Sequence, residues 1–189
     1  SIYKDAKGDY TKVFWADLES NPYLLEYLKN NPIKDKKAIV IGCGVGDDAK
    51  SLIESGYKVT AFDISPSAID LCKKRYPESK INFLVADLFS YPKSWSKEYD
   101  LVYECNTIQI LAGEYRNLAR EQISSLVNEN GRLLVSCRSR LEGKQESDIP
   151  KPLDKNEINN FVLKDKLNEV SFSKYQDNQE PPVWHFFAV

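Results

Sequence analysis

Short apolar runs alternate with amphipathic segments along most of this chain. Runs rich in β-branched and aromatic residues predict strands, because such side chains suit strands that are buried on both faces. Apolar residues at helical spacing predict helices between these strands, and the alternation indicates an α/β fold with a mostly parallel sheet. Strands are expected at residues 38–41, 57–62, 80–85, 99–104 and 132–137, and helices from 22, at 48–55, from 66 to about 76, at 113–128 and up to about 161 after a cap at 154.

The C-terminal part of the chain departs from this alternation. Residues 139–153 show no periodicity, and loops of about fifteen residues in compact domains tend to bind or enclose ligands. We therefore assign this stretch to substrate enclosure. Residues 166–175 and 183–189 alternate apolar and polar positions, which predicts a terminal antiparallel hairpin.

A glycine-rich turn between two strands is the most informative local feature. Gly42, Gly44 and Gly46 follow the first apolar run, where the backbone must turn sharply and admit a ligand closely. Asp63 ends the next strand, at the place where nucleotide-binding βαβ units carry the acid that accepts ribose hydroxyls. The segment predicts a site for an adenosine-containing ligand.

The spacing and the charge of this turn favour one adenosine ligand over another. The dinucleotide fingerprint is GxGxxG, whereas this chain has GxGxG followed by Asp47 and Asp48. Two carboxylates at a helix N-terminus disfavour a pyrophosphate. S-adenosylmethionine carries no phosphate and has two cationic groups, so it fits an acidic turn better than NAD.

The ordered motifs resemble those of the S-adenosylmethionine-dependent methyltransferases with a Rossmann-like fold. The resemblance covers the turn at 42–46, DIS at 63–65, VADLF at 85–89, YDLVYECN at 99–106 and NGRLLVSCR at 130–138. It implies a doubly wound, mostly parallel seven-stranded sheet with a C-terminal antiparallel hairpin. GCGVGDD together with FWADLESNP is similar to the thiopurine, thiol and halide methyltransferases.

The resemblance also implies which residues contact the cofactor. Asp63 corresponds to the ribose ligand and Asp87 to the residue beside the adenine amino group. Val40 stands where many relatives carry an acid for the ammonium group, a role that Asp48 can take over; a plain helix N-terminal charge is the alternative for Asp48. The expected cofactor-binding residues are Trp15, Gly42, Cys43, Gly44, Gly46, Asp48, Asp63, Ile64, Ser65, Asp87, Leu88 and Glu104.

Methyl transfer from a sulfonium needs alignment and exclusion of water more than acid–base chemistry. Trp15 belongs to an aromatic N-terminal segment that is expected to cap the cofactor, where it would lie against the sulfonium or simply pack in the core. Glu104 and Arg138 follow strands at the binding edge and are the candidates for a direct catalytic role, with a rim charge and a surface ion pair as the alternatives.

Composition narrows the possible partners. A chain of 189 residues with a net charge of -2 suggests a single domain, residues 1–36 forming a cap and helix and 37–189 the Rossmann-like core. No basic surface for nucleic acid, no apolar stretch for a membrane and no cysteine pattern for a metal site is evident. A cytoplasmic location is expected, and the oligomeric state is not readable.

The sequence thus predicts an enzyme that transfers a methyl group from S-adenosylmethionine to a small molecule, with thiol, thiopurine, halide and metalloid acceptors as the subgroup-level hypothesis. Two alternatives remain at this stage. One is an NAD(P)-dependent oxidoreductase, and the other is a non-catalytic module that binds S-adenosylmethionine.

Overall fold

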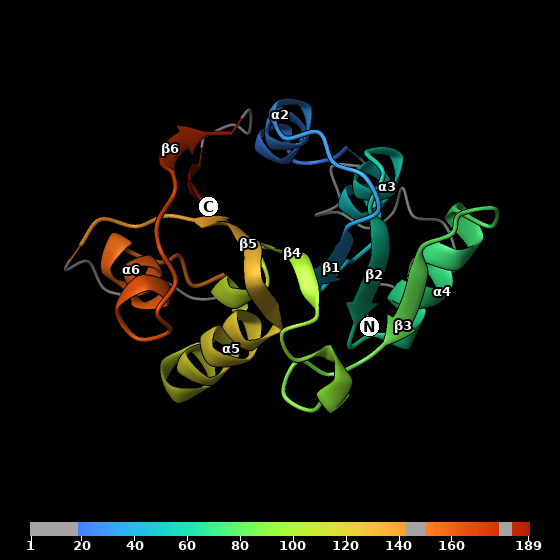
Figure 1. Ribbon diagram of the computed structural model, residues 1–189. Helices are drawn as coiled ribbons and strands as arrows, with labels where there is room; N and C mark the ends of the chain where they lie inside the picture. The colour runs from blue at the N-terminus through green and yellow to red at the C-terminus, as the bar shows by residue number, and fades with distance from the viewer. Residues whose placement is uncertain (1–18, 143–149, 178–182) are drawn as a thin grey trace. The chain divides into compact units, whose positions relative to one another are not determined.

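Figure 1 shows the computed structural model, in which residues 19–142, 150–177 and 183–189 are described. The chain divides into two units, Ser1–Tyr91 and Pro92–Val189. The predicted N-terminal cap, with Trp15, lies almost wholly outside the described residues. The middle of the predicted enclosing loop, residues 143–149, also lies outside them.

The first unit is built on three parallel strands in the order β3-β2-β1. The central strand of the three is apolar on both faces because helices pack against it, and Ala61 and Phe62 are buried there. Each strand is followed by a helix or a turn at its carboxyl end, so the glycine turn and Asp63 meet at one edge. The elements are α2 (Pro22–Asn30), β1 (Lys37–Ile41), α3 (Asp47–Glu54), β2 (Lys58–Asp63), α4 (Pro66–Arg75) and β3 (Asn82–Val85).

The second unit carries four strands in the order β4-β5-β7-β6. β4 and β5 are parallel, whereas β7 pairs antiparallel with both β5 and β6. The C-terminal hairpin is thus present, but its first strand begins at Phe172 and not at the predicted residue 166. The elements are η2 (Lys93–Trp95), β4 (Tyr99–Cys105), η3 (Ile108–Ile110), α5 (Gly113–Leu126), β5 (Val127–Arg138), α6 (Lys155–Leu163), β6 (Phe172–Gln176) and β7 (Trp184–Ala188).

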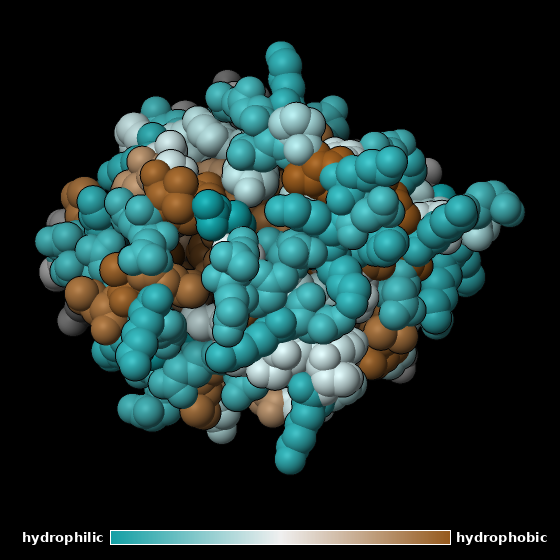
Figure 2. Space-filling model, viewed as in Figure 1, coloured by the Kyte–Doolittle hydropathy of each residue, from teal (hydrophilic) through white to brown (hydrophobic). Residues whose placement is uncertain are grey.

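The fold class predicted from the sequence is confirmed. Across the described residues the seven-stranded sheet is mostly parallel, and the antiparallel pairs are the two that β7 forms with β5 and β6. None of the described helices has the length and apolarity needed to cross a membrane. On the face shown in Figure 2, hydrophilic residues cover most of the surface and apolar residues occur in small patches.

Helix ends follow the local chemistry of the sequence. The Asn21 side chain accepts hydrogen bonds from two backbone N–H groups of α2, and Pro22 is the first residue of that helix. Asp154 provides the predicted cap of α6 and forms a capping box with Glu157, in which each side chain accepts from the backbone N–H of the other residue. These caps depend on residues two or three positions apart, which is why the sequence alone reveals them.

Strand β5 begins five residues before the predicted start at residue 132. Val127 already pairs with Tyr99, and the register then shifts before Leu101 pairs with Arg132. The bulge brings Gly131 against the Tyr99 carbonyl. A Cβ at this position would lie 2.8 Å from that oxygen and 2.9 Å from a methyl group of Val127. The pairing is non-local, so the pattern of apolar residues did not indicate it.

Replacement of Gly131 by Ala is expected to destabilise the protein by about 1–3 kcal/mol, because the added methyl group overlaps backbone that cannot move without breaking the β4–β5 pairing. Urea unfolding of Gly131→Ala measures this loss. Asn130→Ala, at the neighbouring exposed position, is the control and should change the free energy of unfolding by less than about 0.5 kcal/mol. Equal stabilities of the two variants would contradict the proposed overlap.

Candidate functional site

The glycine turn adopts a backbone that only glycine accommodates readily. Gly42, Gly44 and Gly46 have φ values of 59°, 54° and 90°, all in the left-handed region. The Cys43 N–H donates to the Phe62 carbonyl at 2.9 Å, which fastens the turn to β2. The predicted need for three glycines at this turn therefore agrees with its conformation.

Asp63 is the organising side chain of this edge. It is only 9% exposed, and one carboxylate oxygen accepts from the Gly44 N–H at 3.1 Å while the other accepts from the Ser65 N–H at 2.9 Å. Burial raises the pKa of Asp63, and the backbone donors oppose that shift. The carboxylate is thus held rigidly between the glycine turn and the start of α4, and each oxygen keeps further acceptor capacity.

The end of β3 continues the same edge. Asp63 pairs in register with Val85, and the Ala86 N–H donates to the Asp63 carbonyl at 3.1 Å. Asp87 follows directly, and its carboxylate accepts from the Phe89 N–H at 2.9 Å. The two predicted acids therefore follow neighbouring strands at one edge.

Apolar residues neighbour these two acids along the chain. Ile64 is 70% exposed although it directly follows a buried carboxylate, whereas Leu88 is buried. Val85 and Phe89 are also exposed. An exposed apolar rim beside hydrogen-bonding groups is typical of a site for a flat, partly apolar ligand.

The two aspartates after Gly46 have partners within the protein. The Asp47 carboxylate forms an ion pair with Arg75 at 2.6 Å and accepts from the Tyr76 hydroxyl at 3.2 Å. Asp48 accepts from the Asn21 N–H at 2.9 Å and so connects α3 to the start of α2. The charge of Asp47 is therefore compensated, and the electrostatic argument against a pyrophosphate is weaker than the sequence suggested. The role of Asp48 at an ammonium group stays a prediction.

The cysteines of the first unit are not placed for nucleophilic chemistry. The Cys72 thiol donates a hydrogen bond to the Gly44 carbonyl at 3.2 Å and so connects α4 to the glycine turn. Its hydrogen bond with Cys43, together with burial, raises the pKa of the Cys43 thiol. All four cysteines are free thiols. Among the described residues, no group of three or more His, Cys, Asp and Glu side chains is arranged to hold a metal ion.

Glu104 lies in the second unit, near the carboxyl end of β4, and is fully buried. One carboxylate oxygen accepts from the Thr107 N–H at 2.6 Å and the Ile108 N–H at 2.8 Å, while the other has no hydrogen-bond partner among the described residues. Burial raises the pKa of Glu104 to about 7, although the two N–H donors lower it. Glu104 shapes the turn in which Asn106 adopts a φ of 61°.

Gln109 is a buried residue that the sequence analysis did not identify. Its side-chain oxygen accepts from the Arg138 N–H at 2.6 Å, and its carbonyl accepts from the Lys151 N–H at 2.6 Å. It thereby connects the C-terminal end of β5 to the C-terminal part of the 139–153 stretch. A lone amide in the apolar run IQI was the only available signal. The Arg138 side chain itself forms no hydrogen bond or ion pair within the described residues.

The raised pKa of Glu104 makes stability depend on pH. Because the folded-state value of about 7 exceeds the ordinary value of 4.5, the folded protein binds more protons between these limits, and stability falls as pH rises through this window. The loss between pH 4.5 and 8 is expected to be about 3 kcal/mol. Glu104→Gln, which keeps an acceptor for both N–H groups, should remove it.

Urea unfolding at pH 5, 6, 7 and 8 measures this dependence for the wild type and for Glu104→Gln. Glu129→Gln replaces an exposed carboxylate of the same unit and serves as the matched control. It should follow the wild type across the series. If Glu104→Gln lost stability with pH as steeply as the control, the buried carboxyl would not be the titrating group.

Comparisons with known proteins agree with this geometry. Residues 38–131 match a family profile described as a methyltransferase domain. The chain is 23% identical over 125 residues to a probable thiol methyltransferase 2 of Arabidopsis thaliana, covering 64% of this chain and 54% of that relative. It is 27% identical over 97 residues to a ubiquinone biosynthesis O-methyltransferase of Hydrogenovibrio crunogenus, covering 50% and 40%. The chain thus spans about half the length of the curated relatives that it matches.

A solved structure shows the same fold over nearly the whole chain. It is the 1,6-didemethyltoxoflavin-N1-methyltransferase of Burkholderia thailandensis with bound S-adenosylhomocysteine, at a TM-score of 0.76 and 14% identity, covering 98% of this chain and 84% of that one. The predicted cofactor and enzyme class are confirmed at the level of the family. The chain belongs to the class I, Rossmann-like S-adenosylmethionine-dependent methyltransferases.

Proposed function

We propose that this protein binds S-adenosylmethionine at the edge formed by the glycine turn, Asp63 and Asp87, and transfers its methyl group to a small molecule. The observation that carries the proposal is the position of the Asp63 carboxylate, which is held by the Gly44 and Ser65 N–H groups next to the exposed Ile64. This arrangement offers acceptors for ribose hydroxyls beside an apolar surface for a nucleobase.

Each residue of this edge has a defined part in the proposal. Asp63 would accept the ribose hydroxyls and Asp87 the adenine amino group, as the family resemblance implies. Ile64 and Leu88 would contact the base, and the left-handed turn would admit the methionine portion closely. Trp15, Cys43, Asp48 and Ser65 complete the predicted set in the first unit. Glu104 and Arg138 stay candidates in the second.

When bound, the cofactor supplies a sulfonium methyl group, which passes to a nucleophilic atom of the acceptor as the carbon–sulfur bond breaks. The protein's contribution is alignment and exclusion of water. A thiol acceptor loses its proton easily and needs little help, whereas a hydroxyl acceptor benefits from a nearby base. The Glu104 carboxyl, whose pKa is about 7, has one oxygen without a partner among the described residues and is the candidate for that role.

The acceptor class follows less directly from these observations. A thiol methyltransferase among the relatives agrees with the thiol, thiopurine, halide or metalloid acceptors that the GCGVGDD motif suggests, whereas another relative is an O-methyltransferase. Calorimetry with S-adenosylhomocysteine and with NADH separates the methyltransferase from an oxidoreductase. Turnover against thiols, phenols, halides and arsenite separates an enzyme from a non-catalytic binding module.

Replacement of Asp63 by Ala is expected to weaken S-adenosylhomocysteine binding by about 1–3 kcal/mol, because the ribose hydroxyls lose their acceptor. Isothermal titration calorimetry measures this change. Asp63→Asn, which retains one carbonyl oxygen, tests the charge with less disturbance of the turn. Asp70→Ala, an exposed acid on α4, is the matched control and should bind like the wild type. Unchanged affinity in a folded Asp63→Ala protein would remove Asp63 from the site.

A further inference from the structure

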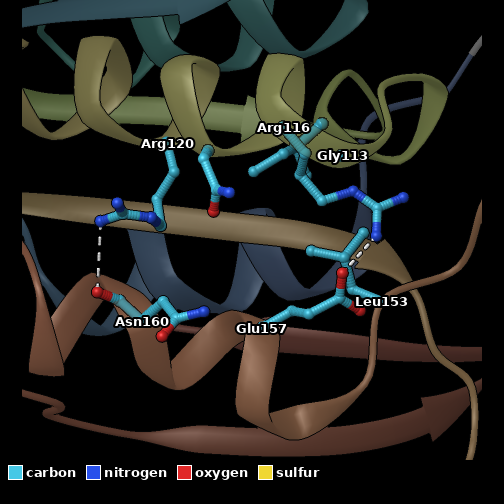
Figure 3. Close-up of a pocket in the computed structure, with 8 residues that line it drawn as sticks. Gly113, Arg116, Arg120, Leu153, Glu157 and Asn160 are labelled. Atoms are coloured by element: carbon cyan, nitrogen blue, oxygen red, sulfur yellow. Dashed lines mark hydrogen bonds and ion pairs between the residues drawn. The ribbon is translucent and has the colours of Figure 1, made fainter.

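Arginine side chains that join a carboxylate to backbone carbonyls occur in both units. In the second unit Arg116, on α5, forms an ion pair with Glu157 of α6 (Figure 3) and donates to the carbonyls of Leu111 and Lys151, each at 2.9 Å. In the first unit Arg75, the last residue of α4, makes the same kind of contacts with the glycine turn and the start of α3. The first arrangement joins two helices, whereas the second acts on the backbone of the proposed cofactor edge.

The Arg75 guanidinium binds the Asp47 carboxylate with both terminal nitrogens. Nη2 pairs with one carboxylate oxygen at 2.6 Å and Nη1 donates to the other at 2.8 Å, which is the bidentate geometry of strong arginine–carboxylate pairs. Both side chains are only 14% exposed, so solvent screens the pair little. Nη1 also donates to the Val45 carbonyl at 3.2 Å. One planar group thus fixes both the first residue of α3 and a carbonyl inside the glycine turn.

Tyr76 supports the same carboxylate and packs against the turn. Its hydroxyl donates to Asp47 at 3.2 Å, and its ring centroid lies 5.0 Å from the guanidinium carbon of Arg75. Burial and the Asp47 charge raise the pKa of the Tyr76 hydroxyl, which therefore stays a donor. A Cβ at Gly46 would lie 3.1 Å from a ring carbon of Tyr76 and 3.2 Å from the sulfur of Cys72. The end of α4 therefore lies directly against the turn.

The carbonyl groups of the turn show how much of its conformation depends on α4. The carbonyls of Cys43 and Gly46 accept from backbone N–H groups of the same segment, at 2.9 and 3.0 Å. The two carbonyls between them accept from side chains of α4: Gly44 from Cys72 and Val45 from Arg75. These side chains are 28 and 30 residues away in the sequence. Contacts outside the turn therefore orient two of its peptide groups.

We propose that Arg75 and Asp47 are positioning residues of the cofactor site, whose ion pair holds the glycine turn in the conformation that admits S-adenosylmethionine. They act on the cofactor through the backbone of the turn. This role rests on the proposed function of the chain. It depends on the geometry of the bidentate pair and not on the net charge beside the turn.

Calorimetry with S-adenosylhomocysteine on the full chain tests this role. Arg75→Gln and Asp47→Asn should each raise the dissociation constant at least about tenfold, because small displacements of a binding group have effects of this size. The double variant should bind like either single variant, since the two side chains act as one unit. Arg75→Lys keeps the charge but loses the planar fork, so its dissociation constant should lie near that of Arg75→Gln.

Two control variants separate positioning from charge and from general stability. Lys74→Gln removes an exposed positive charge at the neighbouring position of α4 and should bind like the wild type. Arg116→Gln breaks the comparable pair of the second unit, so it should lower the melting temperature and leave the dissociation constant unchanged. Without ligand, the backbone amide NMR signals of the glycine turn should move in the variants of the ion pair and stay in place in both controls.

Three results would overturn the positioning role: a folded Arg75→Gln or Asp47→Asn protein binds like Lys74→Gln, Arg75→Lys has the wild-type affinity, or the effects of the single variants multiply in the double variant. If a variant of the pair fails to fold, Tyr76→Phe removes only one hydroxyl from Asp47. It should raise the dissociation constant about threefold, and an unchanged value would count equally against the role.

The wild-type titration separates this inference from the proposed function. If the wild type does not bind S-adenosylhomocysteine, the proposed function is removed. If the wild type binds it and the variants of the ion pair bind equally well, only the positioning role is removed.

Discussion

The Asp63 carboxylate accepts hydrogen bonds from two backbone N–H groups, and the arrangement of the proposed cofactor edge depends on these two bonds. One bond fixes the glycine turn after β1 and the other fixes the start of α4, so a single side chain sets the relative position of three segments. Both donors come from the backbone, which explains why the turn needs glycine conformations more than particular side chains. The exposed Ile64 follows from the same geometry, because the inward carboxylate turns its neighbour outward.

The second unit contains the same kind of contact, in which a buried acid accepts hydrogen bonds from backbone N–H groups of a turn. Glu104, near the end of β4, accepts from the Thr107 and Ile108 N–H groups and so shapes the turn that leads into η3. Burial raises the pKa of both acids, but Glu104 keeps one oxygen without a partner in the described residues, whereas both oxygens of Asp63 are bonded. A buried acid that organises a turn and retains an unused oxygen can serve structure and proton transfer together.

Features that depend on neighbouring residues could be predicted from the sequence, whereas contacts between residues far apart in the chain could not. The three glycines and the caps at Asn21 and Asp154 depend on neighbours within a few positions, so their residue types sufficed. The partner of Asp47 is Arg75, 28 residues away, and without it the turn looked more acidic than it is. Gln109 and the bulge at Gly131 likewise act through non-local contacts. The cofactor prediction held because the motifs carried it, although one of its electrostatic reasons was overstated.

The proposed cofactor site is built largely on the backbone of a glycine turn, whereas recognition of an acceptor depends on side chains. This difference explains why family membership identifies the cofactor better than the acceptor. The match to the family profile covers residues 38–131, which include the glycine turn, Asp63 and Asp87 but not β6 and β7. The proposed cofactor contacts depend on a turn whose left-handed conformation glycine adopts readily. Contacts with an acceptor depend on individual side chains, and a single substitution alters their charge or shape. Relatives that match half or more of this chain accordingly include a thiol methyltransferase and an O-methyltransferase, because acceptor choice depends on side chains carried by a shared fold.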